Sequence, residues 1–101
     1  MIVQRNVFQL EFGAAREAVA IMREMPALAE RLALPGQHRL LTDLTGEMYT
    51  LVLEVAVRDL AALQDGARMF ADPGWREQQA RMNPLVRSAR KDLFQVVELS
   101  G

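Results

Sequence analysis

The stretch that decides the fold is residues 47–57, which read EMYTLVLEVAV. Nearly every second side chain of this run is large and apolar, whereas the side chains between them are mixed in character. That alternation predicts a β-strand with one buried face and one partly polar face. The predicted buried face holds Tyr49, Leu51, Leu53, Val55 and Val57, and the mixed face holds Met48, Thr50, Val52, Glu54 and Ala56.

Three further strands are predicted around this one. Residues 38–44 precede it, and Thr45-Gly46 supplies the turn of a hairpin. The chain opens with a similar alternation over residues 2–12, and its last apolar run, residues 93–99, is interpreted as the fourth strand. In the opening strand, one face carries Asn6, Phe8, Leu10 and Phe12.

Two helical stretches separate these strands. Residues 14–25 carry apolar side chains at helical spacing, and Pro26 predicts a kink or restart. Asp59 is a predicted N-cap for the second stretch, which restarts at Asp72-Pro73. The resulting order is βαββαβ, so the predicted fold class is α+β: a ferredoxin-like, four-stranded antiparallel sheet with both helices on one face.

Length and composition limit what the chain can be. Its 101 residues suffice for one hydrophobic core, so we treat residues 1–101 as a single domain. The net charge of −1 gives no general attraction to nucleic acid or to an anionic membrane. The absence of cysteine excludes disulfides and thiolate chemistry. We expect a cytoplasmic protein, because no apolar run reaches the roughly 20 residues of a membrane span and the N-terminus does not read as a signal peptide.

The sheet face that the helices leave open also requires cover. Four strands of this length expose on the order of 400 Å² of sheet, which is at the limit of what soluble monomers usually show. Pairing two such faces across a two-fold axis buries both, so we predict a homodimer. The predicted interface comprises Arg5, Val7, Val52, Glu54 and Val96, with Arg5, Glu54 and Glu98 available to pair across it.

Two segments resemble the dimeric α+β barrel superfamily. Residues 5–13, RNVFQLEFG, resemble its opening strand and glycine; residues 70–76, FADPGWR, and residues 84–86, PLV, are most similar to NIPSNAP-like domains. Antibiotic-biosynthesis-monooxygenase-like domains are the second resemblance. The resemblance implies dimerisation sheet to sheet into a barrel, and often a small-molecule pocket between the sheet and the second helix. Members include cofactor-independent oxygenases, haem-degrading enzymes and many proteins with no known activity.

The haem-degrading branch of this superfamily uses an Asn on the first strand with a Trp and a His on the second helix. Asn6 matches the first of these, but Met69 and Gln79 stand where the Trp and the His would be. The one histidine, His38, lies near the start of the second strand. We therefore expect no haem held by an axial ligand from the second helix, and no other cofactor or metal.

A candidate ligand pocket between the sheet and the second helix comprises Asn6, Phe8, Tyr49, Met69, Trp75 and Gln79. Three of these, Asn6, Tyr49 and Gln79, would be convergent polar groups in an apolar pocket. Each candidate also has a structural interpretation: Asn6 as a partner of backbone groups, and Trp75 as a core residue. His38 is either a solvated residue at the entry of a strand or a general base.

Two function classes remain open at this point. One is a NIPSNAP-like protein that binds a small aromatic or polyketide-like molecule, and the other is a cofactor-independent monooxygenase or isomerase. Nucleic-acid binding is not expected, because the predicted third strand has no platform of exposed aromatic side chains. The basic residues Arg76, Arg81, Arg87, Arg90 and Lys91 are interpreted as a solvated helix face.

Overall fold

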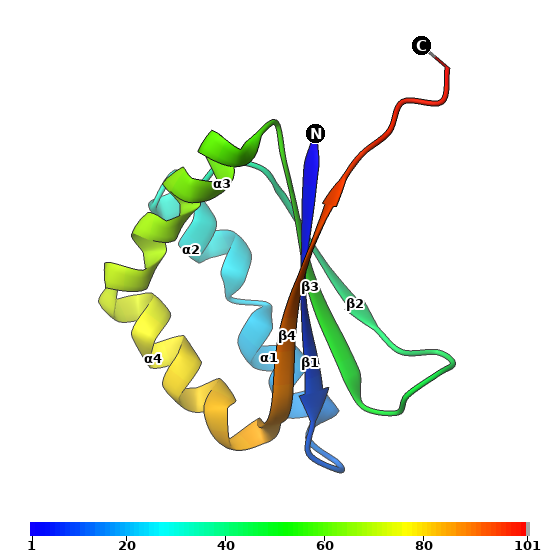
Figure 1. Cartoon of the computed structure of the whole chain (residues 1–101). Helices are drawn as coiled ribbons and strands as arrows, with labels where there is room; N and C mark the ends of the chain where they lie inside the picture. The colour runs from blue at the N-terminus through cyan, green and yellow to red at the C-terminus, as the bar shows by residue number, and fades with distance from the viewer. Residues whose placement is uncertain (101) are drawn as a thin grey trace.

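The structure is a computed structural model that describes residues 1–100, and Figure 1 shows the course of the chain. The strands are β1 (Ile2–Leu10), β2 (Gln37–Thr42), β3 (Thr50–Val57) and β4 (Val86–Gln95). The helices are α1 (Ala15–Met22), α2 (Met25–Arg31), α3 (Leu60–Asp65) and α4 (Pro73–Met82). Two 3-10 segments follow the later helices: η1 (Gly66–Ala71) after α3, and η2 (Asn83–Leu85) after α4.

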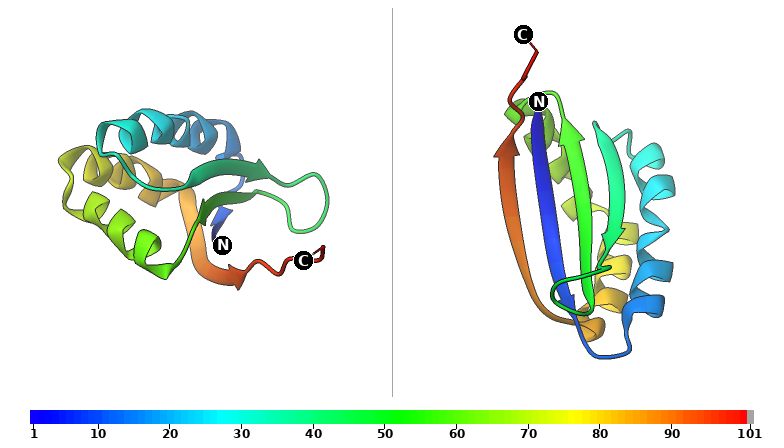
Figure 2. Two further views of the ribbon diagram at one scale, coloured as in Figure 1. Left: turned by 90° about the horizontal axis from the view of Figure 1, so that it is seen from above. Right: turned by 90° about the vertical axis from the view of Figure 1, so that its right-hand side faces the viewer.

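The four strands form one antiparallel sheet in the order β2-β3-β1-β4. The helices all lie against one face of this sheet, and the other face is left open (Figure 2). The predicted βαββαβ order and the ferredoxin-like α+β fold class are therefore confirmed. No helix in the part of the chain that the structure describes is long and apolar enough to cross a membrane.

Short local signals set the ends of the helices as predicted. The first helical stretch is interrupted before Pro26, which lies in the first turn of α2. The Asp59 carboxylate accepts a hydrogen bond from the Ala62 amide at 2.9 Å and caps α3. Asp72 caps α4 by accepting from the Trp75 amide at 3.0 Å. The second stretch is not one helix up to this cap, however, because α3 ends at Asp65 and the chain continues as η1.

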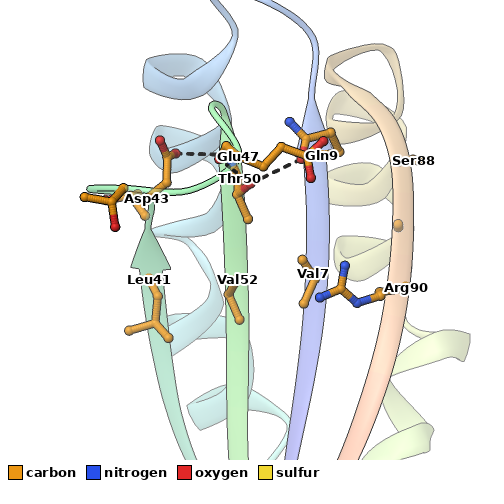
Figure 3. A pocket seen from close by; sticks show the side chains of 12 residues that line it. Val7, Gln9, Leu41, Asp43, Glu47, Thr50, Val52, Ser88 and Arg90 are labelled. Atoms are coloured by element: carbon orange, nitrogen blue, oxygen red, sulfur yellow. Dashed lines mark hydrogen bonds between the residues drawn. The ribbon is translucent and has the colours of Figure 1, made fainter.

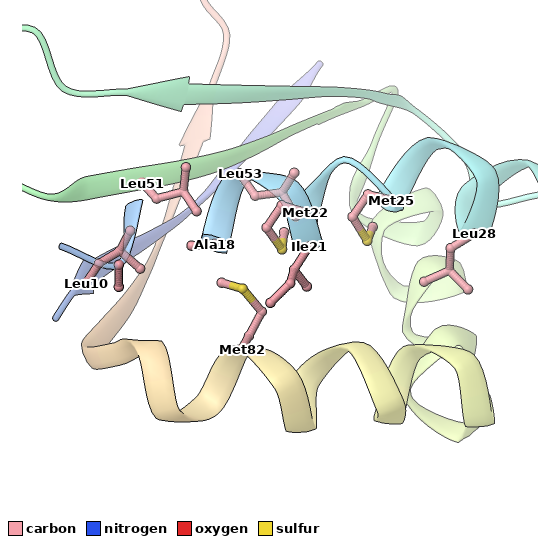
Figure 4. Close-up of a cluster of buried hydrophobic side chains, with 10 residues drawn as sticks. Leu10, Ala18, Ile21, Met22, Met25, Leu28, Leu51, Leu53 and Met82 are labelled. Carbon is pink, nitrogen blue, oxygen red and sulfur yellow. The ribbon is translucent and has the colours of Figure 1, made fainter. Parts of the chain in front are cut away.

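The hydrophobic core lies between the sheet and the two longer helices, α1 and α4 (Figure 4). Leu51 and Leu53 of β3 point into it, as the alternation in residues 47–57 predicts. Met82 of α4 meets them from the opposite side and is 2% exposed. The remaining members are Leu10, Ala14, Ala18, Ile21, Met22, Met25 and Leu28.

The fourth strand is much longer at its start than the sequence predicts. It begins at Val86 rather than Leu93, ends at Gln95, and pairs with β1 along the whole of that strand. Arg87, Arg90 and Lys91 therefore lie on β4, so their interpretation as residues of a helix face is wrong. The physical reason is that hydrogen bonding to β1 holds this charged, polar segment in an edge strand. Most side chains of this edge strand are exposed, so the strand forms without the apolar alternation by which a strand is predicted.

The β2–β3 connection is longer than the predicted two-residue turn. β2 ends at Thr42 and β3 begins at Thr50, which leaves residues 43–49 as a loop. Tyr49 has φ +58°, a left-handed conformation that is strained for an aromatic residue. The loop tolerates this strain because the Tyr49 carbonyl accepts a hydrogen bond from the Leu10 amide at 2.8 Å and its ring packs on Phe12, with centroids 5.1 Å apart.

Candidate functional site

The helix-covered face of the sheet forms the floor of a cavity of about 240 Å³, which we call the helix-side cavity. The segment formed by α3 and η1 supplies part of its lining and lies on the helix-covered side of the sheet (Figure 1). Most of its lining is apolar, and its polar side chains are few. The floor is lined by Gln4, His38, Val55, Val57 and Lys91, and the roof by Ala62, Leu63, Ala67, Met69 and Phe70.

Strand register places the polar side chains of the floor on the same face of the sheet, with His38 and Lys91 on its two edge strands. His38 on β2 pairs with Val55 on β3, and Val55 pairs with Gln4 on β1, so these three residues form one row across the sheet. Lys91 on β4 is paired with Asn6 in the next row. Because side chains two residues apart on a strand share a face, all of these point to the helix side.

Gly36 sets the entry of β2 and thereby the position of His38. Its φ is +93°, and a Cβ at this residue would lie 2.5 Å from the Ala56 carbonyl oxygen. A side chain there would be both strained and obstructed, so only glycine fits. His38 follows two residues later and is half-buried, and this burial lowers the pKa of its imidazole. The ring is therefore neutral at pH 7 and can accept a proton.

An aromatic pair forms one end of the roof. Phe70 lines the cavity and contacts Trp75 edge to face, with ring centroids 4.9 Å apart. Trp75 also packs against the hydrophobic core. The chain's one tryptophan therefore lies directly behind a cavity wall, which makes its fluorescence a reporter of events in the cavity.

The open face of the sheet carries a second, more polar depression of about 400 Å³, which we call the sheet-face hollow (Figure 3). Val7, Leu41 and Val52 form its apolar part. Thr50 stands at its rim, where its amide donates to the Asp43 carboxylate at 3.0 Å and its hydroxyl lies 3.2 Å from the Gln9 side-chain oxygen.

A charged cluster lies beside this hollow on the open face. Glu54 is 6% exposed and accepts hydrogen bonds from Arg5 at 2.9 Å and Arg39 at 3.0 Å. The guanidinium groups of Arg39 and Arg5 hold the pKa of the Glu54 carboxyl below its usual value. Arg5 also lies over the Phe94 ring, 5.3 Å from its centroid. Glu54 thus has partners within its own chain, including Arg39, which the sequence did not single out.

Comparisons with known proteins give structural relatives only. No family model and no curated protein matches the chain by sequence. A NIPSNAP domain protein from Burkholderia xenovorans superposes with a TM-score of 0.82 at 17% identity, over 100% of this chain and 99% of that one. A NIPSNAP family protein from Agrobacterium tumefaciens gives 0.83 at 15% identity, over 98% and 95%.

The fold is that of NIPSNAP domain proteins. A structure from the group of oxygenases superposes with a lower TM-score. SnoaB, a cofactor-independent oxygenase from Streptomyces nogalater, gives a TM-score of 0.71 at 22% identity, over 98% of this chain and 95% of that one. The NIPSNAP-like resemblance, with antibiotic-biosynthesis-monooxygenase-like domains second, is confirmed for the fold.

The six residues of the predicted pocket do not line one common cavity. Met69 lines the helix-side cavity. Phe8 and Gln79 line a separate cavity of about 170 Å³ near the end of α4, and Tyr49 lines a groove beside α1. Asn6 lines none of these cavities, and its amide makes only long hydrogen bonds, 3.5 Å to the Leu53 carbonyl and 3.4 Å from the Gln4 amide. The predicted trio of Asn6, Tyr49 and Gln79 therefore shares no cavity.

The helix-side cavity also contains polar residues that the sequence did not place there. Gln4 and Lys91 were not predicted, and His38 was placed at a solvated strand entry or as a base without a pocket. The sequence could have indicated the position of His38, because His38 is two residues before Leu40 on β2 and the two side chains therefore share the helix-covered face. No such signal existed for Lys91, since its place depends on the pairing of β4 with β1. No group of three or more metal-binding side chains occurs among residues 1–100.

Proposed function

We propose that this chain is a single-domain, homodimeric protein of the dimeric α+β barrel type that binds a small aromatic or polyketide-like molecule in the cytoplasm. The observation that supports this most is the helix-side cavity, whose mostly apolar walls enclose a few polar groups. Binding sites for small molecules typically have this composition. The cavity, at about 240 Å³, is smaller than the roughly 300–1,000 Å³ of drug-sized pockets, so the ligand is of about one or two fused rings.

The homodimer is supported by the open face of the sheet. Val7, Leu41 and Val52 lie there without cover from any described helix, and Phe94 is 48% exposed. A second copy related by a two-fold axis would cover these side chains and the sheet-face hollow together. The proposed interface retains the predicted residues Arg5, Val7, Val52, Glu54 and Val96, and adds Leu41 and Phe94.

Binding to the helix-side cavity is tested with two small aromatic probes, 2-naphthol and 2-naphthoate, followed by amide chemical shifts. We expect the probes to shift the amide signals of Gln4, His38 and Ala67. Ala62→Phe fills the cavity and abolishes these shifts, because Ala62 lines it. Ala61→Phe is the matched control, because Ala61 is adjacent to Ala62 in sequence but is exposed and lies outside the cavity lining. Shifts that survive Ala62→Phe, or no shifts with either probe, would contradict the proposal.

A second candidate function is a cofactor-independent monooxygenase or isomerase. The half-buried, neutral His38 imidazole favours it, because such a ring could remove a proton from a phenol or from a carbon beside a carbonyl. The fold likeness to SnoaB also supports it. Exchange with D2O of the C–H protons beside the carbonyl of 2-tetralone would separate the two functions. Exchange that is faster than without protein and is lost in His38→Gln supports an enzyme, and the absence of acceleration supports a binding protein.

A further inference from the structure

The helix-side cavity has an unbalanced charge. The one lysine and the one histidine of the chain, Lys91 and His38, both line it, and no aspartate or glutamate does. Lys91 forms no ion pair with any residue in the described part of the chain. The cavity therefore offers hydrogen-bond donors and a cation without an acidic partner inside the protein.

The acidic groups near the cavity are already engaged elsewhere. Asp92 follows Lys91 in sequence but points to the open face, where Arg90 lies 3.1 Å from it. On α3, Asp59 caps the helix, and Asp65 pairs with Arg68 at 3.1 Å. None of these carboxylates lines the cavity, so the Lys91 ammonium group is available to an anion from outside the chain.

Lys91 is solvent-exposed, but it borders an apolar part of the cavity. A ligand that covers Val55, Leu63 and Phe70 would exclude water from the ammonium group and so strengthen its attraction to an anion. The Gln4 amide lies on the same face as Lys91, one row away along the sheet. An ammonium group and an amide N–H together suit an oxygen anion, because both donate hydrogen bonds and the first is charged.

We propose that the ligand of the helix-side cavity is an apolar monoanion whose carboxylate or phenolate oxygen binds Lys91 and Gln4. Its ring or alkyl body lies against Val55, Leu63 and Phe70, and His38 lines the cavity from the opposite edge strand, β2. This inference rests on the proposed small-molecule binding and adds the charge of the ligand to it.

The test compares two probes of the same shape, 2-naphthoate and the neutral 2-naphthamide, by calorimetry and amide chemical shifts. We expect the native protein to bind the carboxylate about tenfold more tightly, as one charge-assisted hydrogen bond typically provides. Lys91→Met should remove most of that preference and leave the amide's affinity within about twofold. Arg87→Met is the matched control, because it removes the same charge from the same strand outside the cavity lining and should keep the preference.

Each outcome identifies which proposal fails. Equal affinity for the two probes, or a preference that survives Lys91→Met, overturns the anionic ligand while leaving small-molecule binding intact. If neither probe binds, or if binding persists in Ala62→Phe, the proposed function fails and the anionic ligand fails with it. A phenolate is distinguished from a carboxylate by binding of 2-naphthol that strengthens as the pH rises toward its ionisation.

Discussion

At the scale of single residues, Gln78 places a polar amide in the contact between α4 and α1, with 2% of its surface exposed. Its Nε2 donates to the Ile21 carbonyl at 3.2 Å, but its Oε1 has no partner among the described residues. The Ile21 carbonyl also accepts from the Glu24 amide at 3.1 Å, so it stays bonded without Gln78. The side chain is therefore needed more for its volume than for its polarity.

We expect Gln78→Met to change the free energy of unfolding by less than about 1 kcal/mol, because it removes a buried, unpartnered oxygen together with one hydrogen bond. Gln78→Ala should lower the free energy of unfolding by about 2 kcal/mol or more, since it leaves a void. Urea unfolding of both variants measures the difference. Equal destabilisation of the two would show that the amide itself is required.

The sequence partly indicates this burial. Gln78 precedes Met82 by four residues, and residues so spaced share a helix face. The predicted pocket instead contains Gln79 together with Trp75, because residues four apart share a helix face. In the structure Gln79 is half-buried and Gln78 is the more deeply placed of the two.

At the scale of elements, Asp72 connects α2 to α4. It caps α4 and forms a two-pronged ion pair with Arg31 of α2, at 3.0 and 2.7 Å. Hydrogen bonding to Arg31 is the largest cause that lowers the pKa of Asp72, to about 2 from its ordinary 3.8, and the Trp75 amide adds to it. Since the folded pKa lies below the unfolded one, this contribution is complete above about pH 4 and is lost as the pH falls toward 2.

We expect the melting temperature of the native protein to fall more steeply between pH 4 and pH 2 than that of Asp72→Asn. At pH 7 the variant should melt at a lower temperature, although its side-chain oxygen can still cap α4. Arg31→Met should cause a similar loss, and the double variant should lose less than the sum of the two. Additive losses would show that the ion pair does not couple the helices.

Local and non-local elements differ in how well the sequence predicts them. Asp59, Asp72 and Pro26 mark helix ends correctly because caps and prolines act on their immediate neighbours. The start of β4 is misplaced because residues 86–92, VRSARKD, have no strand alternation of their own, and only pairing with β1 makes them a strand. Because the start of β4 was misplaced, Lys91 was not predicted to lie on the sheet or to line the candidate site.

At the scale of the whole molecule, the two faces of the sheet differ in whether helices cover them. The helix-covered face is closed by α1, α4 and their connections, whereas no described helix covers the open face (Figure 2). The sequence predicts this asymmetry from the mixed face of residues 47–57. It does not predict that Glu54 already has Arg5 and Arg39 as partners, because Arg39 meets Glu54 only through the register of β2 and β3.

This pairing sharpens the test of the homodimer. Val52 lies between Val7 and Leu41 on the open face, and the nearby arginines are engaged: Arg5 and Arg39 with Glu54, and Arg90 with Asp92. A carboxylate introduced by Val52→Glu would therefore find no free cation at the centre of the proposed interface. An unpaired charge buried there typically costs several kcal/mol, so we expect the variant to be monomeric.

Sedimentation velocity at micromolar concentration measures the outcome against a mass of 11.4 kDa for one chain. The native protein should sediment at twice that mass and Val52→Glu near the mass of one chain. Ala61→Glu adds the same charge to an exposed position on α3, on the opposite side of the molecule, and should remain dimeric. Circular dichroism must show that Val52→Glu is folded, because its monomer keeps the whole core between the sheet and the helices. A native protein that sediments as one chain, or a folded Val52→Glu that stays dimeric, would show that the open face is not the interface.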